Sequence, residues 1–193
     1  GAFDPQIGSE ATDLDTSDEA LFKRSLSGKV WDLPEEMLVL PGHMGETTIG
    51  AENRIFHCAA IGNVCQDLKY RGERAFVKIG ARNTIREFVT INSATGENES
   101  TMVGSGCLLM AYVHIAHNCV IGDEVILANA VNLAGHVHVH DFASIGGVTP
   151  VHQFVSIGEY AFIGGGSRIP QDVPPYLKVA GNPAVVAGLN SIG

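Results

Sequence analysis

Apolar residues recur at every sixth position over the long stretch from residue 101 to residue 172. These positions are Val103, Leu109, Ile115, Ile121, Leu127, Leu133, Val139, Ile145, Val151, Ile157, Ile163 and Ile169. Four positions after each of them comes a small or β-branched residue, such as Cys107, Val113 or Ala143. Neither a strand, with a period of two, nor a helix, with a period of 3.6, explains this repeat. The pattern is typical of a parallel β-helix, in which each hexad forms one flat side and its turn.

Three hexads would complete one triangular coil of eighteen residues. Residues eighteen apart should then stack on adjacent coils, separated by about 4.8 Å. Adding eighteen to His117 gives Gly135, and eighteen more gives Gln153. A side chain that titrates near neutral pH would thus lie one coil from a glycine, whose N–H a ligand can approach closely. A base beside an oxyanion donor is what acyl transfer needs, so this column is a candidate active site.

Six of the eight histidines fall between residues 114 and 152. His136 is one position beyond Gly135, and His152 is one position short of Gln153, so both are expected near the same column. His138 and His140 flank the inward position of a hexad, and we expect them to be structural or solvated.

The hexad code starts at Ile49 but is broken twice before it runs without interruption. The first break covers residues 66–73 and the second covers residues 93–100. A polar break between intact coils indicates a loop that leaves the solenoid, and such loops often carry function.

Residues 1–46 do not carry the code. Their pattern predicts a helix over residues 17–29 and a strand over residues 37–40, so we expect an all-β chain with a short α/β N-terminal segment. The segments Thr12-Asp13-Leu14 and Leu38-Val39-Leu40-Pro41-Gly42-His43 resemble the C-terminal part of a metallo-β-lactamase-fold hydrolase. That resemblance implies Asp13 and His43 as metal ligands. The HxHxDH signature is absent and two ligands are too few, so we expect no metal site here.

Composition narrows the class of protein. Only 7% of the residues are aromatic and 23 are glycine, as a narrow solenoid core requires. The net charge is −9, and ten of the 21 acidic residues lie within residues 1–46, which argues against nucleic-acid binding. No apolar run approaches the roughly 18 residues of a membrane span and no signal peptide is apparent, so we expect a cytoplasmic protein. The cysteines form no CxxC pair and are expected to be buried free thiols. They are Cys58, Cys65, Cys107 and Cys119.

Several motifs resemble the UDP-N-acetylglucosamine acyltransferase family. They include Gln66-Asp67-Leu68-Lys69-Tyr70, His114-Ile115-Ala116-His117, Leu133-Ala134-Gly135-His136, Val151-His152-Gln153-Phe154 and Gln171-Asp172-Val173-Pro174-Pro175-Tyr176. The resemblance covers residues 47–193 and implies a left-handed parallel β-helix that assembles as a homotrimer with active sites between subunits. It also implies a helical domain after residue 193, and a junction between unrelated segments at about residues 46–52. The implied reaction moves a 3-hydroxyacyl group from acyl carrier protein to the 3-hydroxyl of UDP-N-acetylglucosamine, the first step of lipid A synthesis, without a cofactor.

The resemblance also assigns residues. It makes His117 the base and Gly135 the oxyanion glycine, in agreement with the stacking argument. Gly165 matches a position whose size limits acyl length, and a glycine there favours a longer chain. The substrate-binding positions that it implies are Lys69, His114, His136, His152, Gln153 and Asn190. Asn118 departs from the family, because an Asp commonly follows the catalytic His, and Asn92 stands in place of a common His.

Other interpretations remain open at this stage. A γ-class carbonic anhydrase is also a hexapeptide-repeat trimer and binds zinc through histidines, which His114, His117 and His136 could supply, although the ligand spacing is not matched. A chain without the helical domain could also be an inactive, self-associating β-helix. The related N-acyltransferase is less favoured, because the residue 66–70 and 114–117 motifs match the O-acyltransferases.

Overall fold

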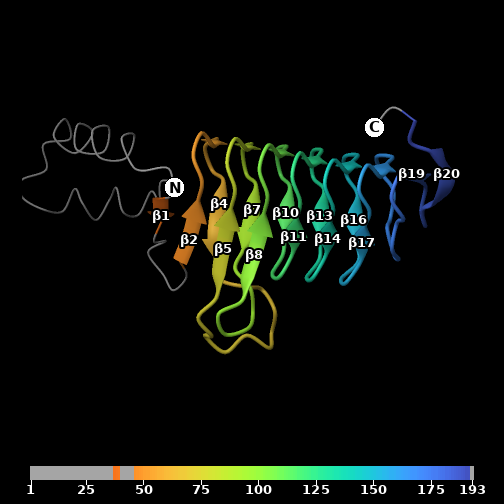
Figure 1. Ribbon diagram of the computed structural model, residues 1–193. Helices are drawn as coiled ribbons and strands as arrows, with labels where there is room; N and C mark the ends of the chain where they lie inside the picture. Colours follow the sequence, from red (N-terminus) through yellow and green to blue (C-terminus); the bar gives the residue numbers. More distant parts are fainter. Residues whose placement is uncertain (1–36, 40–45, 192–193) are drawn as a thin grey trace, which may run out of the picture.

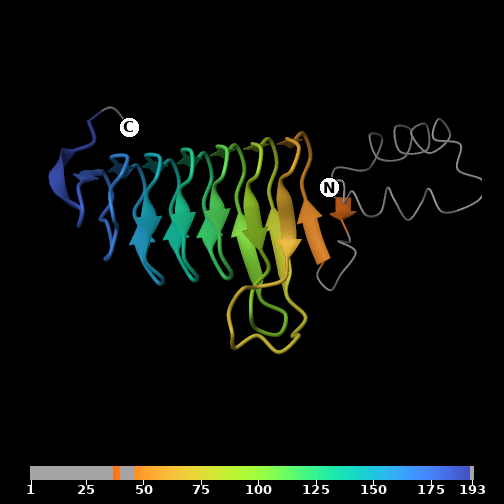
Figure 2. The same cartoon turned by 180° about the vertical axis from the view of Figure 1, so that it is seen from behind.

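The hexad stretch winds into a left-handed parallel β-helix in the computed structural model, which describes residues 37–39 and 46–191 (Figure 1). Three parallel sheets form the flat sides of the solenoid, and successive coils lie one behind another along its axis (Figures 1 and 2). Every regular element within the described residues is a strand. The predicted fold class is therefore confirmed for this part of the chain.

Each sheet collects one strand from each coil. The first sheet contains β1 (Met37–Val39), β2 (Glu46–Ile49), β5 (Phe76–Ile79), β8 (Ser100–Val103), β11 (Val120–Ile121), β14 (His138–Val139) and β17 (Ser156–Ile157). The second contains β4 (Ala60–Asn63), β7 (Thr90–Asn92), β10 (His114–Ile115), β13 (Asn132–Leu133) and β16 (Pro150–Val151). The third contains β3 (Arg54–Ile55), β6 (Thr84–Ile85), β9 (Leu108–Leu109), β12 (Ile126–Leu127), β15 (Ser144–Ile145), β18 (Phe162–Ile163), β19 (Leu177–Ala180) and β20 (Val185–Leu189).

The strand register confirms the eighteen-residue coil. His114 on β10 pairs with Asn132 on β13, eighteen residues later, and the same offset holds between β11 and β14. Two coils are longer than eighteen residues. Ile49 pairs with Ile79, thirty residues on, and Ile79 pairs with Val103, twenty-four residues on. Both offsets are multiples of six, so each loop leaves the solenoid and returns without disturbing the inward positions.

The core is a single column of hexad side chains. Ile115, Leu127, Leu133 and Ile163 are completely buried, whereas their outward neighbours on the same strands are partly or fully exposed. Burial of a Leu or Ile side chain contributes about 1.5–3 kcal/mol, and the repeat supplies one such residue on every side of every coil. Packing along this column therefore holds the coils together.

A matched pair of substitutions on β12 tests this account of stability. Leu127→Ala should lower the free energy of unfolding by about 2–5 kcal/mol, because it leaves a cavity in a core that cannot collapse around it. Ile126→Ala, at a side chain that is 40% exposed, should cost less than about 1 kcal/mol. Urea unfolding followed by circular dichroism measures both, and equal losses would contradict the inward and outward assignment.

Both ends of the solenoid carry an antiparallel strand. β1 pairs with β2 at one end, and β20 pairs with β19 at the other (Figure 1). These strands cover sheet edges that would otherwise offer free backbone groups to another chain. The strand predicted over residues 37–40 is confirmed at Met37–Val39. The predicted helix over residues 17–29, together with Asp13 and His43, lies outside the described residues.

The cysteine prediction is right for three residues and wrong for one. All four cysteines are free, and Cys65, Cys107 and Cys119 are buried, but Cys58 is exposed. Cys58 has a φ of 61°, which makes it the left-handed residue of a corner, and side chains at that place point away from the core. In the described part of the chain, no helix has the length and apolar character needed to cross a bilayer.

Candidate active site

One corner of the prism gathers the chemistry that the sequence singled out. It lies where the chain passes from the second sheet to the first, and it carries the turns after β10, β13 and β16. The two long loops leave the solenoid from the same corner, since they connect β4 to β5 and β7 to β8 (Figure 1). The loops lie against each other, because the Asn98 N–H donates to the Arg74 carbonyl at 2.7 Å. We call this edge the loop corner.

His117 and Gly135 stack at the loop corner as the eighteen-residue spacing predicts. The His136 N–H donates to the His117 carbonyl at 3.0 Å, and the Phe154 N–H donates to the Gly135 carbonyl at 3.1 Å. A Cβ atom built on Gly135 would overlap Cε1 and Nε2 of the His117 ring. The imidazole therefore lies directly on the space that the missing side chain leaves open.

The Gly135 amide has no protein partner among the described residues. Gly135 is the first residue of its turn, and at another corner the matching amides are capped by side chains from the next coil. Ser105 N–H donates to Asp123 Oδ1 at 2.6 Å, and Asp123 N–H donates to Asp141 Oδ1 at 2.9 Å. At the loop corner the residue eighteen further on is the exposed Gln153, which makes no such bond. The Gly135 N–H is therefore left without an acceptor among the described residues, in a residue that is buried beneath the His117 ring.

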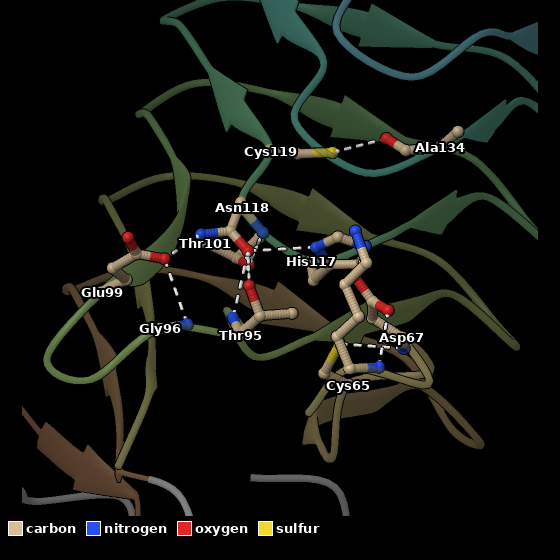
Figure 3. Close-up of polar contacts among 11 residues, drawn as sticks. Cys65, Asp67, Thr95, Gly96, Glu99, Thr101, His117, Asn118, Cys119 and Ala134 are labelled. Atoms are coloured by element: carbon tan, nitrogen blue, oxygen red, sulfur yellow. Dashed lines mark hydrogen bonds and ion pairs between the residues drawn. The ribbon is translucent and has the colours of Figure 1, made fainter. Parts of the chain in front are cut away.

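A hydrogen-bond network fixes the orientation of the His117 ring (Figure 3). Nδ1 lies 3.0 Å from Asn118 Oδ1, an acceptor that also receives the Thr95 N–H at 3.0 Å and the Thr95 hydroxyl at 2.9 Å. Because Oδ1 carries no proton, His117 must donate Nδ1–H to it. The proton of the neutral ring is thus on Nδ1, and Nε2 carries the lone pair that can accept another proton.

Asp67 is a member of this site that the sequence analysis did not single out. Its Oδ2 lies 3.9 Å from Nε2 of His117, and the carboxylate is 27% exposed. Its Oδ1 accepts the Lys69 N–H at 2.9 Å, which keeps the first loop in a tight turn. The hexad register indicates that the first loop leaves and re-enters the solenoid at this corner, but it does not indicate which residue of the loop reaches His117.

Two further histidines are held neutral close by. The ring of His136 meets that of His117 edge-on, with centroids 5.1 Å apart, and stacks on Phe154 at 4.6 Å. Burial, reinforced by the nearby His117, lowers the pKa of His136. Burial likewise lowers the pKa of His114, whose Nδ1 lies 2.7 Å from the Thr90 hydroxyl. Lowered pKa values favour the uncharged imidazole, which can both donate and accept hydrogen bonds.

The remaining predicted residues divide between corners. His152 and Gln153 are exposed at the loop corner, and the exposed Lys69 lies in its first loop. Gly165 follows β18 at a different corner, where it packs beside Gly147. Asn190 lies beyond β20 and donates Nδ2–H to the Tyr160 carbonyl at 2.8 Å, at the third corner. A single chain therefore does not bring Gly165 or Asn190 to the loop corner.

The site is not arranged as a metal centre within one chain. Among the described residues, no three His, Cys, Asp or Glu side chains form a group that could hold an ion. Cys119 lies just before β11, but its thiol donates to the Ala134 carbonyl at 3.1 Å, and burial raises its pKa to about 12. It is therefore a protonated core residue and not a nucleophile or a ligand.

Comparison with known proteins shows which proteins the chain is similar to. Residues 100–135 match the family "Bacterial transferase hexapeptide (six repeats)". The chain is 60% identical over 149 residues to the acyl-[acyl-carrier-protein]–UDP-N-acetylglucosamine O-acyltransferase of Gloeothece citriformis, and 58% identical over 149 residues to that of Synechocystis. The solenoid resembles that of UDP-N-acetylglucosamine O-acyltransferases. Each match covers 77% of this chain and 54% of the relative, so the chain spans about half the length of the curated relatives it matches.

Solved structures of these acyltransferases share the fold. The Arabidopsis enzyme superimposes with a TM-score of 0.75 at 49% identity. The match covers 76% of this chain and 51% of the Arabidopsis chain. The enzyme from Acinetobacter baumannii gives a TM-score of 0.73 at 47% identity, with coverage of 75% and 56%. The hydrolase-like resemblance of residues 1–46 stays a prediction.

Proposed function

We propose that the chain transfers a 3-hydroxyacyl group from acyl carrier protein to the 3-hydroxyl of UDP-N-acetylglucosamine, the first step of lipid A synthesis. The observation that carries the proposal is the loop corner itself, where an oriented imidazole lies against an unpaired backbone amide. The similarity to acyltransferases over three quarters of the chain supports the same reaction. The chain spans about half the length of those relatives. The experiment must therefore test whether this chain itself transfers the acyl group.

In the proposed mechanism, His117 Nε2 accepts the proton of the sugar 3-hydroxyl as that oxygen attacks the thioester carbonyl carbon. A C–O bond forms, and the carbonyl oxygen becomes an oxyanion that accepts the Gly135 N–H. The intermediate then collapses and the C–S bond breaks. The imidazolium returns its proton to the leaving thiolate, so the ring ends the cycle neutral and no cofactor is consumed.

The surrounding residues suit this pair of substrates. Lys69 is exposed in the first loop, and its ammonium would attract a diphosphate. His114 and His136, held neutral, can exchange hydrogen bonds with sugar hydroxyls without adding positive charge beside the base. His152 and Gln153 extend the same surface on the next coil.

We further propose that three copies of the chain complete the site. Within one chain Gly165 and Asn190 lie at other corners than His117, and a threefold assembly would bring corners of neighbouring prisms together. Gly165 would then line the acyl groove, where the absence of a side chain leaves room for a long acyl group. We expect the assembly to work in the cytoplasm.

One assay tests the function and the acyl preference together. The chain is incubated with UDP-N-acetylglucosamine and 3-hydroxyacyl carrier proteins of C10 and C14 length, and the products are identified by mass spectrometry while size-exclusion chromatography with light scattering gives the mass of the assembly. We expect a 3-O-acylated sugar nucleotide, faster transfer from C14, and a trimer. No ester product would refute the function, and a preference for C10 would refute the role given to Gly165.

A further inference from the structure

The second loop supplies the loop corner with a carboxylate. Glu99 Oε2 accepts the Asn118 Nδ2–H at 2.6 Å, on the side of the amide away from His117 (Figure 3). The amide thus bridges two groups, with Oδ1 toward the imidazole and Nδ2 toward Glu99. The short N–H···O⁻ distance is typical of a charge-assisted hydrogen bond.

Glu99 is held in this position by its own loop. The Gly96 N–H donates to Oε2 at 3.1 Å, and a Cβ atom built on Gly96 would overlap the Glu99 carboxylate. The Glu99 carbonyl accepts the Phe76 N–H at 2.9 Å, which ties the residue to the first sheet. The carboxylate therefore folds over a glycine that leaves it room, and it points toward Asn118 although its side chain is exposed to solvent.

The chemistry of the base explains why such a carboxylate matters. When His117 takes a proton the ring becomes positive, and the amide of Asn118 can accept its Nδ1–H but cannot balance the charge. On the opposite side of the ring lies Asp67, at 3.9 Å from Nε2, where the sugar hydroxyl must also approach. The ring of His136, whose pKa is lowered by burial, meets the His117 ring edge-on.

We propose that Glu99 is a positioning residue that acts on His117 through Asn118. Its negative charge polarises the amide, holds Oδ1 toward Nδ1–H, and stabilises the imidazolium that forms during transfer. The pair of Glu99 and Asn118 thereby performs in two residues what one aspartate next to the histidine would perform. This inference rests on the proposed function of the site.

A charge exchange between the two residues tests the proposal. Glu99→Gln keeps an acceptor for Asn118 but removes the charge, and should lower kcat about tenfold with little change in KM. Asn118→Asp would bring two carboxylates within hydrogen-bond distance of each other, where both cannot ionise without moving apart. Its kcat should also fall about tenfold, and more steeply as the pH rises. The double variant Asn118→Asp/Glu99→Gln restores one charge and one amide, and should return kcat to within about threefold of the parent.

Glu97→Gln is the matched control. Glu97 lies in the same loop and its Oε2 accepts the Arg74 N–H at 2.9 Å, but it has no bond to the His117 network. Its kcat should stay within about twofold of the parent, since surface substitutions away from a network change little. Losses that simply multiply in the double variant would overturn the proposal, because a merely structural Glu99 could not be replaced by moving its charge.

A measurement without turnover separates this proposal from the function on which it rests. With [15N]histidine labelling, NMR at about pH 6.5 reports the protonated fraction of the His117 ring. Glu99→Gln should lower that fraction and the double variant should restore it, whether or not the chain transfers acyl groups. An unchanged fraction in both variants would overturn the proposal, whereas an inactive parent with the expected NMR response would refute only the proposed function.

Discussion

Replacing His117 with alanine is expected to lower kcat by about 10²–10⁴-fold, the range that general-base catalysis contributes. The substitution removes the only group that the mechanism gives for taking the proton of the sugar hydroxyl. The fold should persist, because His117 lies in a turn outside the buried hexad column, with a side chain 15% exposed. Steady-state assays of thioester consumption measure the loss, and circular dichroism with light scattering checks the fold and the assembly.

His138→Ala is the matched control for that experiment. His138 is also on an eighteen-residue column, but it is exposed on β14 within the first sheet, and its ring meets that of His140. Its kcat should remain within about twofold of the parent. Retained turnover in His117→Ala would refute the base assignment, and a comparable loss in His138→Ala would point to a general effect of removing histidines.

Gly135→Ala should lower kcat by about 10²-fold or more without unfolding the chain. The added Cβ would occupy the space now taken by Cε1 and Nε2 of His117, so the ring must move off the column. A displacement of about 1 Å in a catalytic group can cost about 10²-fold. The Gly135 backbone is not in the left-handed region that disfavours alanine, so the strain falls on the imidazole and not on the turn.

The same substitution in the His117→Ala background provides its control. Once the ring is gone, the methyl group added by Gly135→Ala no longer has an imidazole to displace, so the double variant should be no less active than His117→Ala alone. Turnover close to that of the parent in the single variant Gly135→Ala would show that the ring and the amide need not be in contact. A further large loss in the double variant would place the damage in the backbone instead.

The hexad repeat could predict the fold and the stacking of His117 on Gly135, because both follow from the same eighteen-residue spacing. Inward residues such as Leu127 and Ile145 recur every six positions, and the strand register then fixes which turns stack. His117 and Gly135 share a column for that reason alone. Even the shared corner of the two loops is encoded, since the two breaks in the code follow Ile61 and Ile91, which both belong to the second sheet.

The hydrogen-bond network lies beyond what spacing can predict. Asp67 and Glu99 reach the site from loops that leave the solenoid, and their paths depend on local contacts such as the bond from the Asn98 N–H to the Arg74 carbonyl. The likeness to a family suggested Lys69, Gly165 and Asn190, but it could not tell that the last two lie at other corners of the prism. The sequence pattern describes the fold of one chain. It does not predict how several chains would pack, and so it cannot tell which corners would meet in an assembly.

A crystal structure of the chain with the acylated sugar nucleotide bound tests the central claim most directly. The account predicts the ester at the loop corner, with the sugar O3 within about 3.2 Å of His117 Nε2 and the acyl carbonyl oxygen about 2.7–3.1 Å from the Gly135 amide nitrogen. An ester bound at another corner, or one whose carbonyl turns away from Gly135, would contradict it.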